Sequence, residues 1–442
     1  MMTEKQPVNI FWFRRDLRFE DNCGLYHALS SGLPVLPVFI FDKNILDPLP
    51  RHDSRITFIH QTLEEMNRQL NKLKCGLDIR YGRPVEIFKS LVRAYDIKLV
   101  YVNHDYEPYA LQRDSEIKIL LQEHGIDFRT YKDQVIFEKN EIINQSGKPY
   151  TVFTPYRKAW QENLHAGDLA PYPSQALLDH LLQQNPERIP TLQDMGFEKT
   201  AVEIPPTDVS EDILRLYDRQ RDFPGIDGTS KISVHLRFGT VSIRRQVEKG
   251  LSLNETWLSE LIWREFFMMI LANFPHVVER PFNANYESIP WKNNEKDFRR
   301  WCDGTTGYPI VDAGMRELNT TGYMHNRVRM ITASFLTKHL LIDWRKGERY
   351  FALKLMDYDL AANNGNWQWA AGCGCDAAPY FRVFNPYIQT KKFDPEYQYI
   401  RRWVPEFDTP DYPEPMIEHS IARKRALAVY REALKKDEKS ES

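Results

Sequence analysis

The stretch DYDLAANNGNWQWAAGCGCDAAPYFR, residues 357–382, decides how the rest of this 442-residue chain is interpreted. It contains two acids two residues apart, paired asparagines, and the tryptophans Trp367 and Trp369. Because a helix turns by about 100° per residue, two indoles at this spacing point about 200° apart. An amphipathic core helix does not need that arrangement. We therefore predict that one indole faces inward while the other lines a different space.

Composition is typical of a globular enzyme with two or three domains. Hydrophobic residues make up 42% of the chain and charged residues 27%. The sequence contains no run of eighteen apolar residues and no signal-peptide pattern, so a membrane location is not expected. Five scattered cysteines fit neither a disulfide framework nor a zinc site. We therefore expect a reduced, cytoplasmic protein.

Charge is unevenly distributed along the chain. The net charge is −2, which argues against a protein that coats nucleic acid non-specifically. Between Met315 and Lys354, however, eight Lys or Arg residues stand against three Asp or Glu. If these basic side chains surround a pocket, they could hold phosphate groups.

The first third of the chain alternates short apolar runs with helical patterns. Strands are predicted at 9–13, 34–41, 77–81, 98–102 and 127–131, and helices at 21–31, 52–73, 84–95 and 108–124. This alternation predicts a doubly wound parallel sheet over residues 1–132. No G-x-G-x-x-G follows the first strand, so a dinucleotide site is not supported there.

The rest of the chain has a different pattern. Six prolines between 171 and 206 indicate a long connector, which we place at 133–206. Residues 207–442 repeat apolar positions at i, i+3 and i+4, as in 258–270, 314–318 and 328–341. The predicted fold is therefore an α/β domain, a connector and an all-helical domain.

Four shorter motifs carry chemically useful side chains. WFRRDLRFEDN (12–22) follows the first strand, where it could bind a ligand or form a structural Arg–Asp network. GTSKIS (228–233) could cradle phosphates or cap a helix. WLSELIWREFF (257–267) and GYMHNRVRM (322–330) place polar and apolar groups on shared helix faces. Such faces suit a flat ligand with a polar edge that lies close to phosphates.

The segments TGYPIVDAGMRELNTTGYMHNRVRMITASFLTKHLLIDWRKGERYF (306–351), DLAANNGNWQWAA (359–371) and DAAPYFRVFNP (376–386) resemble the photolyase/cryptochrome flavoprotein family. Within that family, they most resemble the class I cyclobutane pyrimidine dimer photolyases. The resemblance implies an α/β antenna domain at 1–132, the connector, and a helical domain at 207–442 that binds FAD and DNA.

Matching motif positions imply the residues that hold FAD. Those that would hold its phosphates and ribityl chain are Tyr217, Thr229, Ser230, Lys231, Ile232 and Ser233, with Trp257 nearby. Asp357 and Asp359 would lie along the isoalloxazine ring, and Asn363 would face its N5. Arg329 would pair with an acid beside the flavin.

The same comparison implies a substrate pocket and an electron path. The pocket would be lined by Glu260, Trp263, Asn326, Arg327, Met330 and Trp369, and the DNA backbone contacted by Gln389, Lys391, Lys392, Arg401 and Arg402. Indoles at Trp291, Trp344 and Trp367 match a chain that carries electrons from the surface to the flavin.

The implied reaction is light-driven and redox-neutral. Excited reduced flavin donates an electron to a pyrimidine dimer flipped out of DNA, the cyclobutane ring splits, and the electron returns. Glu260 would stabilise the dimer radical anion by hydrogen bonding. The implied partner is DNA containing such dimers, and the protein would act as a monomer.

Two other family functions are distinguishable by residue type. Cryptochrome-like photoreceptors commonly replace the N5-facing Asn363 with Asp or Cys, and (6-4) photolyases carry histidines at the positions of Asn326 and Met330. The antenna chromophore stays open. Where pterin-binding relatives have Asn-Glu, this chain has Tyr109-Ala110, which argues against the usual folate contacts. The residues EPY followed by RD are closer to relatives that use a deazaflavin, but they do not identify one, so a deazaflavin, a pterin and an empty site all stay open.

Overall fold

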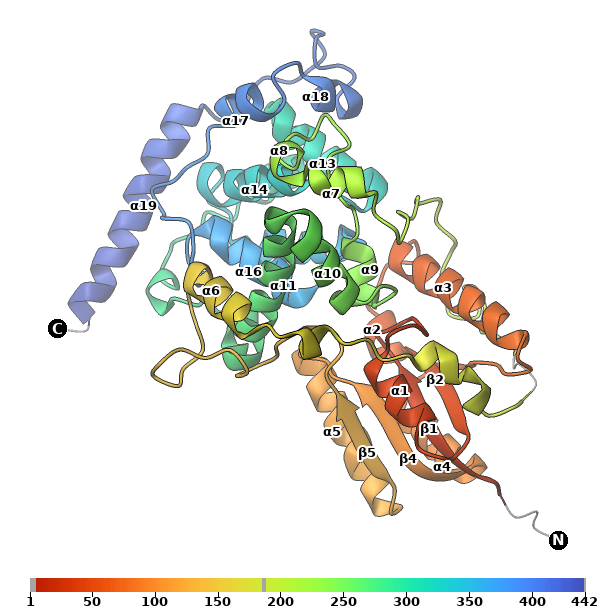
Figure 1. The fold of residues 1–442 in the computed structure, drawn as a ribbon. Helices are drawn as coiled ribbons and strands as arrows, with labels where there is room; N and C mark the ends of the chain where they lie inside the picture. The colour runs from red at the N-terminus through yellow and green to blue at the C-terminus, as the bar shows by residue number, and fades with distance from the viewer. Residues whose placement is uncertain (1–4, 185–187, 441–442) are drawn as a thin grey trace. The chain divides into compact units, whose positions relative to one another are not determined.

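The computed structural model describes residues 5–184 and 188–440, which divide into two units (Figure 1). The first unit comprises Met1–Glu138, Asn163–Asp208 and Ile232–Lys249. The second comprises Lys139–Glu162, Val209–Lys231 and Gly250–Ser442. The proline-rich connector predicted over 133–206 therefore contributes residues to both units.

A five-stranded parallel sheet forms the centre of the first unit. Its spatial order is β3-β2-β1-β4-β5, with β1 (Pro7–Phe13), β2 (Val35–Asp42), β3 (Asp78–Gly82), β4 (Asp96–Asn103) and β5 (Asp127–Tyr131). Ile10 of β1 lies beside Leu36 of β2 and Val100 of β4. All five predicted strands exist, and the doubly wound α/β prediction is confirmed.

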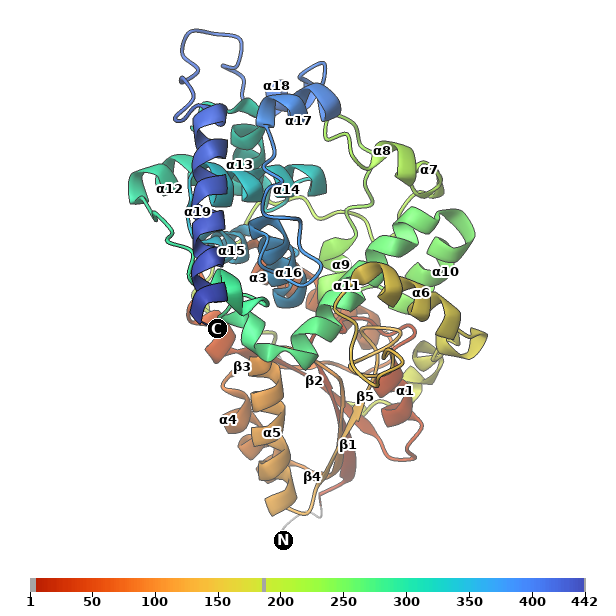
Figure 2. The ribbon, with the colours of Figure 1, turned by 90° about the vertical axis from the view of Figure 1, so that its left-hand side faces the viewer.

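Helices cover both faces of this sheet (Figure 2). On one face, α4 (Pro84–Ala94) and α5 (Pro108–Glu123) pack Phe88, Leu91 and Ile117 against Trp12 and Val100. On the other lies α1 (Cys23–Leu29). The remaining helices of this unit are α2 (Lys43–Leu46), α3 (Ser54–Asn71), η1 (Ala166–Leu169), η2 (Ser174–His180), α9 (Ser233–Phe238) and most of α10 (Ile243–Leu253).

The WFRRDLRFEDN motif lies between the ends of β1 and β4, where strand order reverses and α/β proteins commonly bind ligands. Here the chain's own side chains occupy that position. Asn103 at the end of β4 donates to Asp16 at 2.7 Å and to Asn22 at 2.8 Å, and all three side chains are buried. The motif is therefore a structural network, one of the two interpretations that the sequence allowed.

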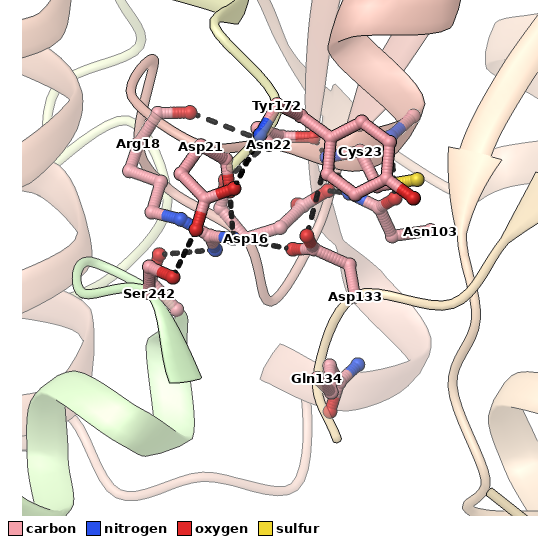
Figure 3. Close-up of polar contacts among 12 residues, drawn as sticks. Asp16, Arg18, Asp21, Asn22, Cys23, Asn103, Asp133, Gln134, Tyr172 and Ser242 are labelled. Atoms are coloured by element: carbon pink, nitrogen blue, oxygen red, sulfur yellow. Dashed lines mark hydrogen bonds and ion pairs between the residues drawn. The ribbon is translucent and has the colours of Figure 1, made fainter. Parts of the chain in front are cut away.

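A buried ion cluster continues this network (Figure 3). Asp133 accepts from Arg18 at 2.7 Å, from Arg244 at 2.8 Å and from the Cys23 backbone N–H at 3.2 Å. Asp21 also accepts from Arg244, and from the Ser242 hydroxyl. Burial alone would raise the pKa of Asp133, but Arg18 and Arg244 hold it below its ordinary value.

The second unit is helical. Its elements are α6 (Phe153–Asn163), α7 (Glu211–Arg215), α8 (Tyr217–Gln220), α11 (Glu255–Asn273), η3 (Pro275–Val278), η4 (Ala284–Tyr286), α12 (Glu295–Cys302), α13 (Pro309–Thr321), α14 (Asn326–Ser334), η5 (Phe335–His339), α15 (Trp344–Lys354), α16 (Leu360–Ala371), α17 (Pro386–Phe393), α18 (Gln398–Trp403) and α19 (His419–Ser440). The all-helical prediction is confirmed. Within residues 328–341, where the sequence shows helical spacing, α14 is followed by η5, which is a π-helical turn.

Helix α16, formed by the 357–382 stretch, packs against α11, α14 and α15. A Cβ on Gly365 would lie 2.2 Å from the Phe267 ring of α11, and one on Gly347 of α15 would lie 2.1 Å from the Trp367 indole. Glycine is therefore required at both contacts, since any side chain would separate the helices. Among the described residues, no helix is long and apolar enough to cross a membrane.

The Asp133 cluster generates a prediction about stability. Asp133→Asn should lower the free energy of unfolding by about 3–5 kcal/mol, because two buried guanidinium groups lose their shared carboxylate. Denaturant unfolding at pH 7 measures this, with Asp208→Asn as control, because the Asp208–Lys249 pair is exposed and should matter little.

The pH dependence has a defined sign. The folded-state pKa of Asp133 is depressed, so its contribution is present above the unfolded-state pKa of about 3.9 and is lost as the pH falls further. The difference between wild type and Asp133→Asn should therefore narrow in acid. A difference that stays constant from pH 7 to pH 3 would contradict the assignment.

Candidate functional site

The site is organised by α16 and its partner α15. Asp359 caps the start of α16 by accepting from the Ala362 N–H at 3.2 Å. Asn363 and Trp367, one turn apart, both face α15. Trp367 packs on Gly347, and the Asn363 amide donates to Glu348. Trp367 is 2% exposed whereas Trp369 is partly exposed, and both indoles contact the same apolar cluster.

The Asn363 amide is held in one orientation. Its NH₂ group donates to the Glu348 carboxylate at 2.8 Å and to the Glu348 carbonyl at 3.1 Å. Burial raises the pKa of Glu348, which the bond from Asn363 partly offsets. Within the described chain no donor reaches the amide oxygen of Asn363, so this atom is available to a ligand.

A second polar centre lies just before α16. Arg329 of α14 donates to Asp357 at 2.9 Å and to the Met324 carbonyl at 2.7 Å. The other carboxylate oxygen of Asp357, Oδ1, is buried and has no hydrogen-bond partner among the described residues. An ionised oxygen in this position is costly unless a donor from a ligand reaches it.

The residues predicted to hold the FAD phosphates and ribityl chain are not all in one unit. Tyr217 starts α8 and is buried, and Thr229 lies 3.3 Å from the Tyr323 hydroxyl. Ser230 is partly buried, and Lys231, with φ of 49°, pairs with Asp227. Ile232 and Ser233 begin α9 and belong to the first unit. Trp257 is buried in the first turn of α11.

Three of the predicted substrate residues are joined by two residues that the sequence did not single out, Arg221 and Asp222. Arg221 donates to Glu260 of α11 at 2.5 Å. Asp222 accepts from Arg327 of α14 at 2.7 Å, and Arg327 in turn reaches the Met330 sulfur at 3.6 Å. The loop after α8 therefore links α11 to α14 through partly exposed charges.

Trp263 is part of an aromatic stack. Its ring lies parallel to that of Phe153 in α6, with centroids 3.6 Å apart and planes inclined by 9°, and Phe267 packs at 5.4 Å. Phe153 itself is buried. It is positioned by its backbone N–H, which donates to Asp376 at 3.0 Å. The aromatic wall at Trp263 therefore includes a residue of the predicted connector.

The other substrate and DNA residues lie nearer the surface. Asn326 is the exposed first residue of α14, and Gln389 is partly buried on α17. Exposed cations follow on α17 and α18: Lys391, Lys392, Arg401 and Arg402. Arg401 pairs with Asp408 at 2.8 Å, which lowers its availability to DNA.

The three predicted electron-chain tryptophans share one apolar cluster. Trp344 and Trp367 are buried members and Trp291 packs against the cluster. Trp344 starts α15 one turn before Gly347, on which Trp367 lies, so the two indoles occupy neighbouring positions. The cluster also holds Trp301, 6.1 Å from Trp367, which the sequence analysis did not identify.

Residues 9–176 match the family described as DNA photolyase, and residues 257–410 match the FAD binding domain of DNA photolyase. The deoxyribodipyrimidine photo-lyase of Synechococcus sp. is 36% identical over 95% of this chain and 96% of its own length. This chain belongs to the DNA photolyase family. It is thus an enzyme of a family whose helical domain binds FAD, as the sequence resemblance indicated.

Solved structures share the fold. A class III photolyase from Agrobacterium tumefaciens is 34% identical, with a TM-score of 0.84 over 98% of this chain and 99% of that one. A cryptochrome from Synechocystis sp. is 25% identical, with a TM-score of 0.83 over 97% of this chain and all of that one. The likeness therefore extends to repair enzymes and to cryptochromes alike.

The residues present fit a flavin. Asp357 Oδ1 is a buried acceptor in need of a donor, and Asn363 presents an amide oxygen nearby in sequence on a rigid helix. Arg329, which is partly exposed, supplies a positive charge beside Asp357, and this carboxylate raises the pKa of Arg329 despite the opposing effect of burial. These three residues could hold the polar edge of a flat heterocycle.

Tyr109 occupies the position used above to compare antenna chromophores. Its side chain forms hydrogen bonds within the first unit. Its hydroxyl donates to Asp42 and accepts from Asn44 at 3.1 Å. Burial and Asp42 raise the pKa of Tyr109 to about 12. A hollow of about 320 Å³ lies beside it, lined by Asn44, Arg83, Pro84, Val85, Glu86, Tyr109, Gln112, Arg113 and Glu116. The identity of any antenna chromophore stays open.

Some residues of the site carried little sequence signal. Arg221 and Asp222 stand in an ordinary charged segment, RQRDF, and only their partners identify them. Phe153 lies in a region interpreted as connector, and Glu348 is one charge among several in WRKGERYF. Glu348 follows Trp344 by four residues, so the two side chains share a face of a helix. This spacing was the sequence feature that could have identified Glu348.

The unpartnered Oδ1 of Asp357 leads to a prediction about FAD retention. Asp357→Asn should reduce the flavin retained through purification, because the amide removes the charge that faces Arg329 and the ligand. The ratio of flavin to protein absorbance measures retention. Asp343→Asn is the matched control, because Asp343 caps α15, where asparagine caps equally well, and its carboxylate pairs with Arg345 rather than with Arg329. Equal flavin content in both variants would contradict the role of Asp357.

Proposed function

We propose that this protein repairs cyclobutane pyrimidine dimers in DNA, using light and reduced FAD. The observation that carries the proposal is the network Glu260–Arg221 and Asp222–Arg327–Met330, which joins hydrogen-bonding groups and a thioether from the loop after α8, from α11 and from α14. Trp263 shares the Glu260 face of α11. Such a set can contact both the polar edges and the flat faces of two linked pyrimidines.

Each residue of this set has a distinct task. Glu260 and Arg327 are oriented by Arg221 and Asp222, so they can meet a base edge without first losing side-chain freedom. Trp263 and Trp369 supply aromatic surface, and Met330 supplies a polarizable contact. A crosslinked dimer pairs and stacks poorly in the duplex, so flipping it out costs less than flipping normal bases.

Reduced FAD, when bound and excited by light, supplies the electron that opens the cyclobutane ring and recovers it afterwards. The protein's own residues hold the polar groups around the flavin in fixed orientations and partly exclude water. Asn363 is clamped by Glu348, and Asp357 is clamped by Arg329. Because these groups are preorganised, they need little rearrangement as charge moves.

DNA is expected to approach through α17 and α18, where Lys391, Lys392 and Arg402 are exposed. Basic side chains there compensate for a net charge of −2, which alone would repel a polyanion. The five cysteines are buried and free, which fits the proposed cytoplasmic location.

Two alternatives remain within the family. A cryptochrome-like photoreceptor would share the fold, but the retained Asn363 favours an enzyme. A (6-4) photolyase is disfavoured by Asn326 and Met330, where histidines are typical of that class. The deciding experiment is repair of defined lesions by chemically reduced protein under blue light. Repair of cyclobutane dimers alone is expected, and repair of (6-4) products alone or of neither lesion would refute the proposal.

Another prediction concerns the proposed electron chain of Trp291, Trp344 and Trp367. Trp367→Phe should block photoreduction of oxidised flavin by an external reductant and leave repair by prereduced protein largely intact. Trp301→Phe is the control, because Trp301 packs in the same cluster but lies outside the proposed chain. Absorbance of the flavin under illumination measures photoreduction. Loss of photoreduction in both variants would show that cluster packing, rather than Trp367 itself, is required.

A third prediction concerns discrimination of damaged DNA. Trp263→Ala should reduce the preference for lesion-bearing duplex, because stacking contributes about 1–3 kcal/mol per base and depends little on salt. Arg402→Ala should instead weaken binding to intact and damaged DNA alike and reduce the salt slope by roughly 0.9 per lost phosphate contact. Titrations of both duplexes at several salt concentrations separate the two effects. Unchanged discrimination by Trp263→Ala would remove Trp263 from the pocket.

A further inference from the structure

His325, at the start of α14, carries a buried ring nitrogen without a partner. The side chain is 4% exposed, and its Nδ1 accepts from the backbone N–H of Arg327 at 3.2 Å. Because an accepting Nδ1 is unprotonated, the proton of the neutral ring is on Nε2. Nε2 is therefore a hydrogen-bond donor, and no acceptor among the described residues reaches it. A buried donor in this state is costly unless a ligand supplies the acceptor.

The backbone on both sides of the ring is held in place. The His325 N–H donates to the Glu317 carboxylate at 3.1 Å, to which the Tyr399 hydroxyl also donates at 2.6 Å. The carbonyl of the preceding residue, Met324, accepts from the Arg329 guanidinium at 2.7 Å. The ring can turn toward another partner only by giving up its cap on α14, so the unpartnered Nε2 is a fixed feature of this site.

The charges around the ring suit an anionic ligand. Burial lowers the pKa of His325 to about 4, so the ring is neutral at pH 7. The guanidinium groups of Arg329, Arg327 and Arg221 also favour the neutral form, whereas Asp222 opposes them. These charges come from α14 and from the loop after α8. A neutral N–H donor beside guanidinium groups fits an anionic acceptor, because the arginines balance the charge while the ring supplies a directed hydrogen bond.

His325 also lies near two residues that are expected to hold the FAD phosphates. Thr229 Oγ1 is 3.3 Å from the hydroxyl of Tyr323, which precedes His325 by two residues. The guanidinium of Arg221, one of the groups that act on the His325 ring, lies 5.4 Å from the ring centroid of Tyr217. The segment expected to hold the phosphates and the start of α14 therefore border the same part of the second unit.

We propose that His325 is an FAD-binding residue, whose Nε2–H donates to an oxygen of the FAD diphosphate. The inference depends on the FAD binding of this family and not on the proposed repair of cyclobutane dimers. It also accounts for the opposite characters of two unpartnered atoms, because His325 Nε2 is a donor and Asp357 Oδ1 is an acceptor. FAD has phosphate oxygens that accept and a flavin N–H that donates, so one cofactor satisfies both.

Two substitutions separate this role from helix capping. His325→Asn keeps an acceptor at the Nδ1 position, which caps α14, and removes the Nε2 donor. His325→Gln keeps a donor near the Nε2 position and loses the cap. Dilution of the FAD-loaded protein, followed by the fluorescence of released flavin, gives the dissociation constant. It should rise roughly tenfold or more in His325→Asn and by less than about threefold in His325→Gln. A histidine that only caps the helix predicts the reverse order, and that result would overturn the proposal.

Phosphorus NMR of protein saturated with FAD tests the contact with the diphosphate. His325→Asn should shift at least one phosphate resonance of bound FAD. His339→Gln is the matched control and should shift neither, because His339 is also buried with one unpartnered ring nitrogen but bonds His419 at 2.8 Å. Unchanged phosphate resonances in His325→Asn would reject the contact.

Binding of lesion-bearing duplex by the same variants excludes the other source of an acceptor. If His325→Asn kept wild-type FAD affinity but bound damaged DNA more weakly, the acceptor would be on the lesion and the proposal would be wrong. Dimer repair by wild type is assayed on the same samples. Wild-type protein that retains FAD but repairs no dimers would refute the proposed function alone, and the phosphate resonances would still decide the role of His325.

Discussion

The close approach of α16 to α11 and α15 is the constraint on which the helical unit depends. Gly365 and Gly347 allow this approach, because a Cβ at either position would lie within about 2.2 Å of a ring atom. The face of α16 that carries Asn363 and Trp367 is thereby fixed against α15. One helix can then present an amide to a cofactor and an indole to a buried chain, since positions four apart share a face.

Charged residues have different roles in the two units, and the two sets differ in how deeply their side chains are buried. In the first unit Asp133, Arg18 and Arg244 are almost fully buried and pair with one another, although Arg18 Nε has no hydrogen-bond partner among the described residues. In the second unit the side chains of the Arg221–Glu260 and Arg327–Asp222 pairs are 19% to 37% exposed. Partly exposed pairs cost less to rearrange, so the second set can exchange partners with a substrate.

The sequence predicted the elements well because their patterns are local. Strand alternation, proline at the first turn of α4 and α5, and the helical period after Thr207 each act over a few residues. What it could not predict depends on contacts between distant segments. Two examples are the parallel stack of Phe153 on Trp263 and the Ala371 carbonyl, which accepts hydrogen bonds from both Lys338 and Tyr430. Neither contact leaves a local pattern in the sequence. Motif resemblance located Asn363 but not Glu348, which orients it.

The connector illustrates why such contacts matter for function. Proline-rich sequence suggested a spacer, yet residues 139–162 belong to the helical unit. Phe153, in this segment, stacks on the Trp263 ring. The backbone N–H of Phe153 donates to Asp376, a residue with φ of 47° in the loop after α16. The loop that ends α16 therefore also fixes the first turn of α6. Because both segments meet at the proposed substrate wall, the geometry of Trp263 depends on a residue that no substrate motif contains.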